Sequence, residues 1–491
     1  MGPDGALTRT RGAGVNGTAG LDAKLAPTPT LTLDLTANAD FAQAEVDRQI
    51  VNLTRFSLFF PEQRPFFTEG AGIFDFGRRG QTQLFYSSRR IGLGQNGTPI
   101  PLDGGARLTG RLGAQQIGLT TTRTGGDLPA TAVVGRIKRD VLGRGYVGAM
   151  SSLSAPTDAP STASGGVDFN LPYVVRDQNL VFIGAAAVNG SATKGDPVYA
   201  RGVVDFPNDI ADVALRFERV GEGFQPDLGF VQQRGVTRLG WQTELTPRPS
   251  ALGALGAPFE AIHVRQFKFS VLNGDLVRTM GTTGSLSGLA NGSIRTSPFG
   301  LEFDSGDETS VEFARRYDTP TETFDLFDGA EVEAGRYAWN TAEFQFQSSS
   351  ARNIGVDVTV ARGGFYTGRS SELSASMRGR FAPHVNVSLD NNRTAASLPQ
   401  GPQTLRFTAQ TARLRLDVAS SPRLSSTLLA QWDNESNRGA VNARFRWTTS
   451  PGSDLYVVWT SQWATDLPNG IPWRTPTRGT LVAKYVRYFR V

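Results

Sequence analysis

The chain has 491 residues, of which 39% are hydrophobic and 10% aromatic, with 56 glycines and no cysteine. This composition is rich in turns and poor in continuous apolar cores, and it excludes disulfide frameworks, thiolate metal sites and cysteine nucleophiles. The net charge of +5 comes from arginines scattered at strand spacing rather than gathered in a basic patch, so we expect no nucleic-acid partner. No apolar run reaches about 18 residues, which excludes a transmembrane helix.

Alternation of apolar and polar residues is the dominant pattern from one end of the chain to the other. It begins where Leu31, Leu33 and Leu35 share one face with polar residues between them, a period of two that predicts a β-strand. The same alternation recurs at residues 212–220, 343–347, 356–360 and 412–418. Some connections are short, as at 111–114 and 141–144, and others are long and rich in Gly, Pro, Ser and Asp, as at 154–165 and 318–335.

The length and uniformity of these segments favour one class of all-β protein. Strands of roughly 9 to 12 residues are long enough to cross a bilayer with a tilt, and short turns alternating with long loops are typical of outer-membrane barrels. A soluble sandwich shows the same alternation, but not the same uniformity to the last residue. We predict a flexible N-terminal remnant at 1–16, followed over 17–491 by a single closed antiparallel transmembrane β-barrel of about 22 to 26 strands.

Several segments resemble one bacterial family. These are 35–77, which includes LTRFSLFFPEQRPFFTEG, then 84–92, 104–113, 134–149, 220–240 and 445–459. Together they are similar to the C-terminal barrel of the domain of unknown function family 5916, whose members commonly carry a carbohydrate-binding family 9-like domain ahead of the barrel. The resemblance implies an outer-membrane barrel without established activity. It also implies that a signal peptide, which residues 1–20 lack, and an N-terminal domain were trimmed from the parent protein.

The segment 59–77 departs from the alternation. Two prolines interrupt a run of phenylalanines and charges, and proline cannot sit in a central strand. Irregular backbone at membrane depth must be buried in protein or line a cavity, so we expect a lumen or rim insertion in which Arg64 pairs with Glu62 or Glu69. It is either a plug that constricts a pore or a clamp that closes the barrel. Its candidate residues are Phe59, Phe60, Glu62, Arg64, Phe66, Phe67 and Glu69.

Arginines crowd the first third of the chain. If they point inward they attract anionic solutes; alternatively, they pair with carboxylates to keep a wide barrel round. The candidate lumen charges are Arg89, Arg90, Arg107, Arg111, Arg136 and Arg139, with Arg78 and Arg79 beside them.

The remaining candidate residues, acidic segments and histidines, do not indicate a metal site or a catalytic site. The acidic segments 303–308 and 325–333 match no calcium-loop spacing and are more typical of solvated loops. His263 and His384 are the only histidines, no hydrolase motif accompanies them, and we expect no catalytic residues, metal or cofactor. The chain ends in TLVAKYVRYFRV, which resembles the strand that barrels present to the insertion machinery.

These observations predict a non-enzymatic outer-membrane β-barrel, a porin-like pore or transport channel for saccharides or other polar solutes. The alternatives are a membrane anchor for the N-terminal carbohydrate-binding-type domain and, with less support, an outer-membrane hydrolase. The expected partners are outer-membrane lipid, the barrel insertion machinery and the solute.

Overall fold

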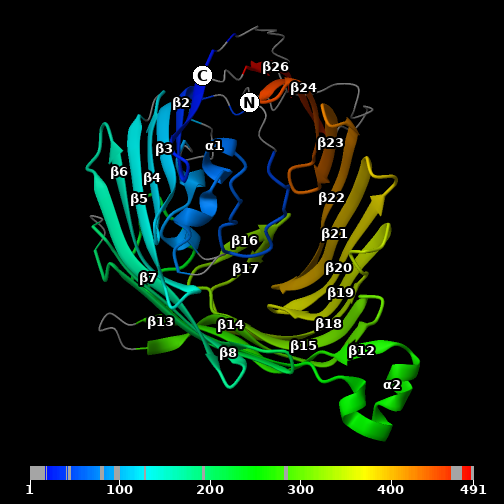
Figure 1. Ribbon diagram of the computed structural model, residues 1–491. Coiled ribbons are helices and arrows are strands. Elements are labelled where there is room, and N and C mark those ends of the chain that lie inside the picture. Colours follow the sequence, from blue (N-terminus) through cyan, green and yellow to red (C-terminus); the bar gives the residue numbers. More distant parts are fainter. Residues whose placement is uncertain are drawn as a thin grey trace.

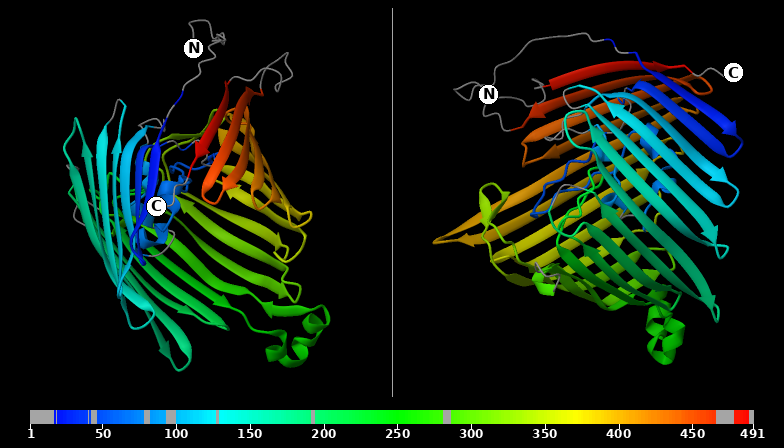
Figure 2. Two further views of the ribbon diagram at one scale, coloured as in Figure 1. Left: turned by 45° about the horizontal axis from the view of Figure 1, so that its top comes forward. Right: turned by 90° about the vertical axis from the view of Figure 1, so that its left-hand side faces the viewer.

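A computed structural model describes residues 17, 19–39, 41, 46–77, 82–92, 100–126, 129–190, 194–280, 286–465 and 478–487. Their dominant feature is one sheet of 24 strands (Figures 1 and 2). The strands of this sheet are β1 (Leu21–Thr28), β2 (Leu31–Ala39), β3 (Leu102–Leu112), β4 (Gln115–Thr124), β5 (Ala130–Val141), β6 (Gly145–Pro156), β7 (Thr162–Val175), β8 (Gln178–Asn189), β9 (Val198–Pro207), β10 (Ala211–Val220), β11 (Val236–Leu245), β12 (Val264–Phe267), β13 (Phe269–Met280), β14 (Leu286–Phe303), β15 (Glu308–Asp318), β18 (Tyr337–Gln347), β19 (Ile354–Phe365), β20 (Gly368–Arg380), β21 (Val385–Gln400), β22 (Gln403–Ser421), β23 (Leu424–Asp433), β24 (Arg438–Ser450), β25 (Ser453–Ala464) and β26 (Arg478–Val486).

The smaller elements lie in the connections. They are α1 (Pro65–Thr68), η1 (Ala71–Phe74), η2 (Thr82–Leu84), η3 (Ser88–Arg90), η4 (Pro249–Leu255), α2 (Ala257–Ala261) and the hairpin of β16 (Phe324–Phe327) with β17 (Ala330–Val332). Within the described part of the chain, no helix has the length and hydropathy needed to span a membrane.

Every strand of the main sheet pairs antiparallel with its neighbours, as in a meander that curves around a central space. The expected all-β class and the single antiparallel sheet of 22 to 26 strands are confirmed. β12 and β13 follow each other directly and both pair with β14, so together they fill one strand position in the sheet. The 24 described strands therefore occupy one position fewer than 24, which is an odd number.

Closure of the sheet is not observed. Among the described residues β1 pairs with β2 and β26 pairs with β25, without a pairing between β1 and β26, although both views of Figure 2 place these strands on the same side of the wall. The end of the expected terminal strand, 488–491, lies outside the described residues, as do the N-terminal 1–16.

The two faces of the wall differ in the way that the alternation predicts. In β10, Leu215 and Phe217 are 53% and 47% exposed on the outer face, whereas Glu218 on the inner face is 7% exposed. The outer apolar residues continue across strands, because Phe344 lies opposite Val360 and Val360 lies opposite Leu373, all of them exposed. The sheet therefore presents apolar side chains outward and polar ones inward.

The connections at the two rims are unequal. One rim, here the short-turn rim, carries the tight turns after β1, β3, β5, β7 and β9. The other, the long-loop rim, carries the connection from β2 to β3, the loop 221–235 and the segment 319–336. The expected loop at 154–165 is wrong in extent, because β6 continues to Pro156 and β7 begins at Thr162.

Candidate functional site

The connection between β2 and β3 folds back inside the ring of strands (Figure 1). We call its described residues 46–77 and 82–92 the insert. Its sequence cannot form a wall strand, because Pro61 and Pro65 lack the amide hydrogen that a ladder needs. Pro65 instead begins the single turn of α1, and Gly70, with φ of 59°, reverses the chain before η1.

An apolar core holds the insert against one part of the wall. Phe67, Phe74, Phe76, Phe85 and Tyr86 of the insert are each at most 9% exposed. They pack with wall side chains that include Val134, Met150 and Tyr199. The rings of Phe76 and Phe85 stack at 4.8 Å, which joins the two halves of the insert. Burial of several aromatic side chains, at about 1.5–3 kcal/mol each, is a large stabilising contribution.

Cationic side chains on the inner face hold the main chain of the insert. The guanidinium of Arg107 donates to the carbonyl of Phe66 at 2.7 Å, and the ammonium of Lys138 donates to the carbonyl of Gly72 at 2.9 Å. Arg136 donates to the carbonyl of Asp75 at 2.8 Å. These bonds satisfy carbonyl groups that the irregular backbone leaves without a ladder partner.

A buried ion pair forms the centre of this attachment. Arg136 and Asp168 form two hydrogen bonds of 2.6 and 2.8 Å, and both side chains are fully buried. Asp168 also accepts the amide hydrogen of Gly77 at 2.9 Å, and the hydroxyl of Tyr146 donates to the carbonyl of Gly77 at 3.0 Å. The pair therefore fixes residues 75–77 to β5, β6 and β7.

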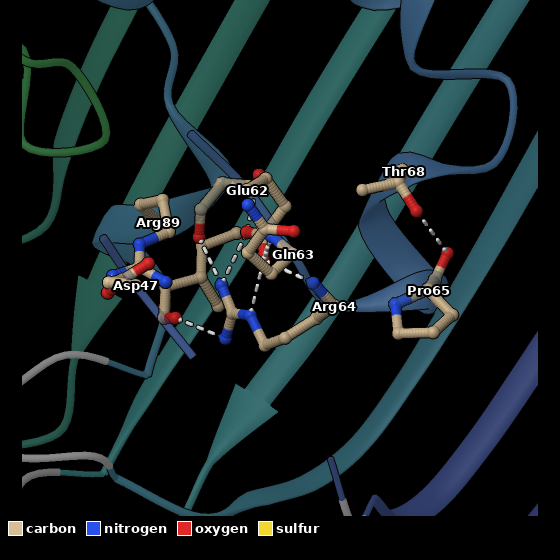
Figure 3. Close-up of polar contacts among 9 residues, drawn as sticks. Asp47, Glu62, Gln63, Arg64, Pro65, Thr68 and Arg89 are labelled. Atoms are coloured by element: carbon tan, nitrogen blue, oxygen red, sulfur yellow. Dashed lines mark hydrogen bonds and ion pairs between the residues drawn. The ribbon is translucent and has the colours of Figure 1, made fainter. Parts of the chain in front are cut away.

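A second ion pair joins the two halves of the insert to each other (Figure 3). Two nitrogens of Arg64 lie 2.8 Å from the two carboxylate oxygens of Glu62, and the same guanidinium donates to the carbonyls of Ser88 and Ile91 at 2.7 and 2.8 Å. Ser88 in turn donates to Glu62 at 2.7 Å. Burial raises the pKa of Glu62, but the bonds and charge of Arg64 outweigh burial and hold this pKa below its ordinary value.

The lowered pKa of Glu62 predicts an acid-sensitive insert. A carboxylate with a depressed pKa in the folded state stabilises the fold above its unfolded pKa of about 4.3, and this contribution is lost as pH falls through the folded pKa. We expect the hydrogen-bonded amides of Gln63, Arg64, Arg90 and Ile91 to be protected from hydrogen exchange at about pH 7 and to lose protection below about pH 4.

Glu62→Gln should show reduced protection at neutral pH and no acid-dependent loss, when rates are corrected for intrinsic exchange. Glu69→Gln is the matched control, because the Glu69 side chain is 59% exposed and pairs with Lys24 on β1. Equal acid dependence in wild type and Glu62→Gln contradicts the assignment.

The insert also reaches the opposite part of the wall. Arg55 pairs with Asp318 at the end of β15 at 2.9 Å. The side chain of Gln431 on β23 bonds the main chain of Asp47 and of Gln49, each at 3.1 Å. The insert is thus attached on both sides of the space that the wall surrounds.

Two further segments from the long-loop rim contact the insert. In the loop 221–235, the carbonyl of Leu228 accepts the amide hydrogen of Ser87 at 2.6 Å, and Phe224 is fully buried. The β16–β17 hairpin packs Phe327 on Phe407 of β22 at 5.5 Å, and Val51 and Leu53 of the insert pack against the same cluster. The expectation of a solvated loop at 325–333 is therefore wrong, because four of its apolar side chains are buried.

The candidate plug residues lie together in the insert, with different partners. Arg64 pairs with Glu62, whereas Glu69 contacts Lys24. The ring of Phe59 lies 5.5 Å from that of Phe230, and Phe66 and Phe67 meet edge to face at 5.0 Å. Phe60 is half-buried.

The six candidate lumen charges lie in four different places. Arg107 and Arg136 are buried beneath the insert, and Arg111 pairs with Asp140 near the short-turn rim. Arg89 and Arg90 belong to η3 of the insert, where Arg89 pairs with Asp47. Arg139 is misassigned, because it is exposed and shares the outer face of β5 with Ile137, which is 47% exposed. Arg78 and Arg79 lie outside the described residues.

A second set of inward arginines was not predicted from the sequence. Arg201, Arg216, Arg238 and Arg295 line one small cavity of about 70 Å³ with Glu218 and Asp275. Arg238 lies 3.4 Å from Glu218 and 3.3 Å from Asp275. Each arginine occupies an inward position of its strand, so the alternation of side chains along these strands could have predicted that it points inward.

The inner face is covered unequally. Beneath the insert, Thr120 and Thr122 of β4 are 1% and 2% exposed. On β18 and β20, by contrast, the inward side chains of Gln345, Glu372 and Ser374 are exposed. One part of the inner wall is therefore sealed by the insert, and another is open to solvent.

The remaining candidates are on the short-turn rim. His263 lies 3.6 Å from Asp304, with both side chains more than half exposed, and His384 is in the turn before β21. Within the described ranges, His, Asp and Glu side chains form no group of three or more that could hold a metal ion.

Comparison with known families matches the segment that contains the insert. The model of a domain of unknown function (DUF5916) matches residues 8–113. The family resemblance is confirmed over this region. The DUF5916 match covers β1, β2, the insert and β3, which places the insert inside the matched region.

No curated protein matches the chain. Among solved structures, the chain is similar to the open form of the ferric-catecholate import receptor Fiu from E. coli K12, at 6% identity and a TM-score of 0.41 over 78% of this chain and 72% of that one. This likeness is too distant to assign a ligand or an activity.

Proposed function

We propose that this chain forms an outer-membrane β-barrel pore for polar solutes, in which the insert is a plug that covers only part of the inner wall. The unequal cover of the inner face carries the proposal. The insert buries the inner face of β3 to β8, while the inward side chains of Gln345 on β18 and of Glu372 and Ser374 on β20 stay exposed. A solute path along that exposed face requires no large movement of the plug.

The outer face supports the membrane location. Apolar side chains such as Phe169, Leu215, Phe344 and Trp459 are each 38% or more exposed. Water-soluble monomers rarely expose apolar patches larger than a few hundred Å², whereas a barrel in lipid buries its outer face in acyl chains. Strands of 12 to 14 residues, as in β5 to β8, also have the length that a tilted crossing needs.

Single cysteines test the path, because the native chain contains none. We expect Gln345→Cys and Ser374→Cys, refolded into planar bilayers, to react with a charged methanethiosulfonate reagent and to lose conductance stepwise. Thr120→Cys is the matched control, since it lies on the inner face beneath the insert and should react more slowly by at least an order of magnitude.

The alternatives give different results. Equal reactivity at Thr120→Cys and Gln345→Cys with conductance present contradicts a plug that covers the inner wall unequally. Silent bilayers from a barrel that is folded by its heat-modifiable migration contradict the pore and favour a membrane anchor, a role that the attachment of the insert to both sides of the wall would suit.

A further inference from the structure

One connection on the short-turn rim is not a turn. Between β11 and β12, residues 249–261 form η4 and α2, which project outside the wall (Figures 1 and 2). We call residues 248–262 the rim element. The pore proposal gives this element no role, because it lies outside the ring of strands.

The rim element is firmly attached to the wall. The ring of Phe259 meets that of Phe267 on β12 edge to face at 4.9 Å, and Phe267 stacks on Phe269 of β13 at 5.2 Å. Backbone bonds of 2.9 Å join Phe267 to Pro247 and Thr246 to Ile210. Phe259 therefore fixes which side of the element faces the wall.

Three large apolar side chains of the rim element are exposed, in an element whose exposed charged residues are Arg248 and Glu260. Leu255 is 78% exposed, Ile262 is 56% exposed and Leu252 is 42% exposed. On β14, which pairs with β12, Phe299 is 66% exposed on the outer face of the wall. The ribbon views place η4 and α2 outside the wall, and not over the central space (Figures 1 and 2).

Charged residues border these apolar side chains. Arg248 pairs with Asp209 at 3.3 Å, and Arg265 pairs with Glu302 at 3.1 Å. A short helical element with exposed leucines and arginines at its borders has the character of an interfacial membrane anchor, whose apolar side enters the boundary between headgroups and acyl chains.

We infer that the rim element lies in the lipid interface beside the short-turn rim, with Leu252, Leu255 and Ile262 inserted among the acyl chains. The inference rests on the proposed membrane location but not on pore activity. Phospholipid is the partner that fits, because the element continues the lipid-facing side of the wall. Its consequence is a barrel held at a fixed depth and tilt on one side.

Spin labels on single cysteines test the inference in the full chain, reconstituted in vesicles of phosphatidylcholine and phosphatidylglycerol. At Leu255→Cys we expect collisions with oxygen to exceed those with a water-soluble nickel chelate. Two labels calibrate the result: Phe344→Cys on the outer face of the wall, and Ser350→Cys in a turn of the same rim, which should be accessible to nickel.

The outcomes separate the two proposals. If Leu255→Cys resembles Ser350→Cys while Phe344→Cys is in lipid, the inference is overturned and the membrane barrel stands. If Phe344→Cys is also accessible to nickel, the membrane location itself fails. All three sites are exposed, so the labels should leave heat-modifiable migration unchanged, and this migration verifies the fold.

Discussion

Replacing Arg136 by alanine should release the insert from the wall. The change leaves Asp168 as a buried carboxylate without its cation and removes the donor to the carbonyl of Asp75. Loss of one partner of a buried ion pair typically costs about 3–5 kcal/mol. We expect a lower urea midpoint and rapid protease cleavage within residues 59–77, measured on the barrel refolded in detergent.

Arg139→Ala is the matched control for this variant. It removes the same side chain from the same strand, but from an exposed position on the outer face, so its effect should stay within about 0.5 kcal/mol. A double variant, Arg136→Met with Asp168→Leu, should recover part of the loss because no unpaired charge remains. Unchanged protease resistance in Arg136→Ala would show that the pair is not needed to hold the insert.

Phe85→Ala should loosen the insert without removing a charge. The Phe85 ring is 1% exposed and stacks on Phe76, and truncation of a buried phenylalanine to alanine costs about 3–5 kcal/mol. If the insert is the plug, single channels of this variant should show frequent excursions to a higher conductance than the wild type reaches.

The control for Phe85→Ala is Phe217→Ala, which removes an equal ring from the outer face, where Phe217 is 47% exposed. Its conductance should match that of the wild type. Steady wild-type conductance in Phe85→Ala, together with a measured loss of stability, would mean that the insert is structural and does not gate the pore.

The two-residue period of a β-strand explains why the sequence predicts correctly which face of the sheet most side chains occupy. Leu215 and Phe217 point outward and Arg216 inward because side chains alternate along a strand. The same rule explains the error at Arg139, which is three residues from Arg136 and must therefore lie on the opposite face. Arg107 and Arg111 are four residues apart and share the inner face, as expected.

The contacts of the insert could not be predicted in this way. The alternation along a strand predicts on which face of the sheet a side chain lies, but not which distant segment of the chain covers that face. The proline and phenylalanine pattern identifies 59–77, yet Phe85 and Tyr86 belong to the same apolar core. Leu228 joins this core from the loop 221–235, and Phe327 of the β16–β17 hairpin joins the second apolar cluster, against which Val51 and Leu53 pack. Asp168 is 91 residues from Gly77, and no local pattern relates the two.

In the described part of the chain, the odd number of strand positions fixes the relative direction of the two edge strands of the sheet. Because neighbouring strands alternate in direction, β1 and β26 run the same way, so any direct hydrogen bonding between them is parallel. Parallel ladders are slightly weaker per residue than antiparallel ones. A barrel that closes by this contact should part first along it under lateral strain. β1 also carries Lys24, which contacts Glu69, so a breach there would pull on the insert, and the wall and the insert would yield as one mechanical unit.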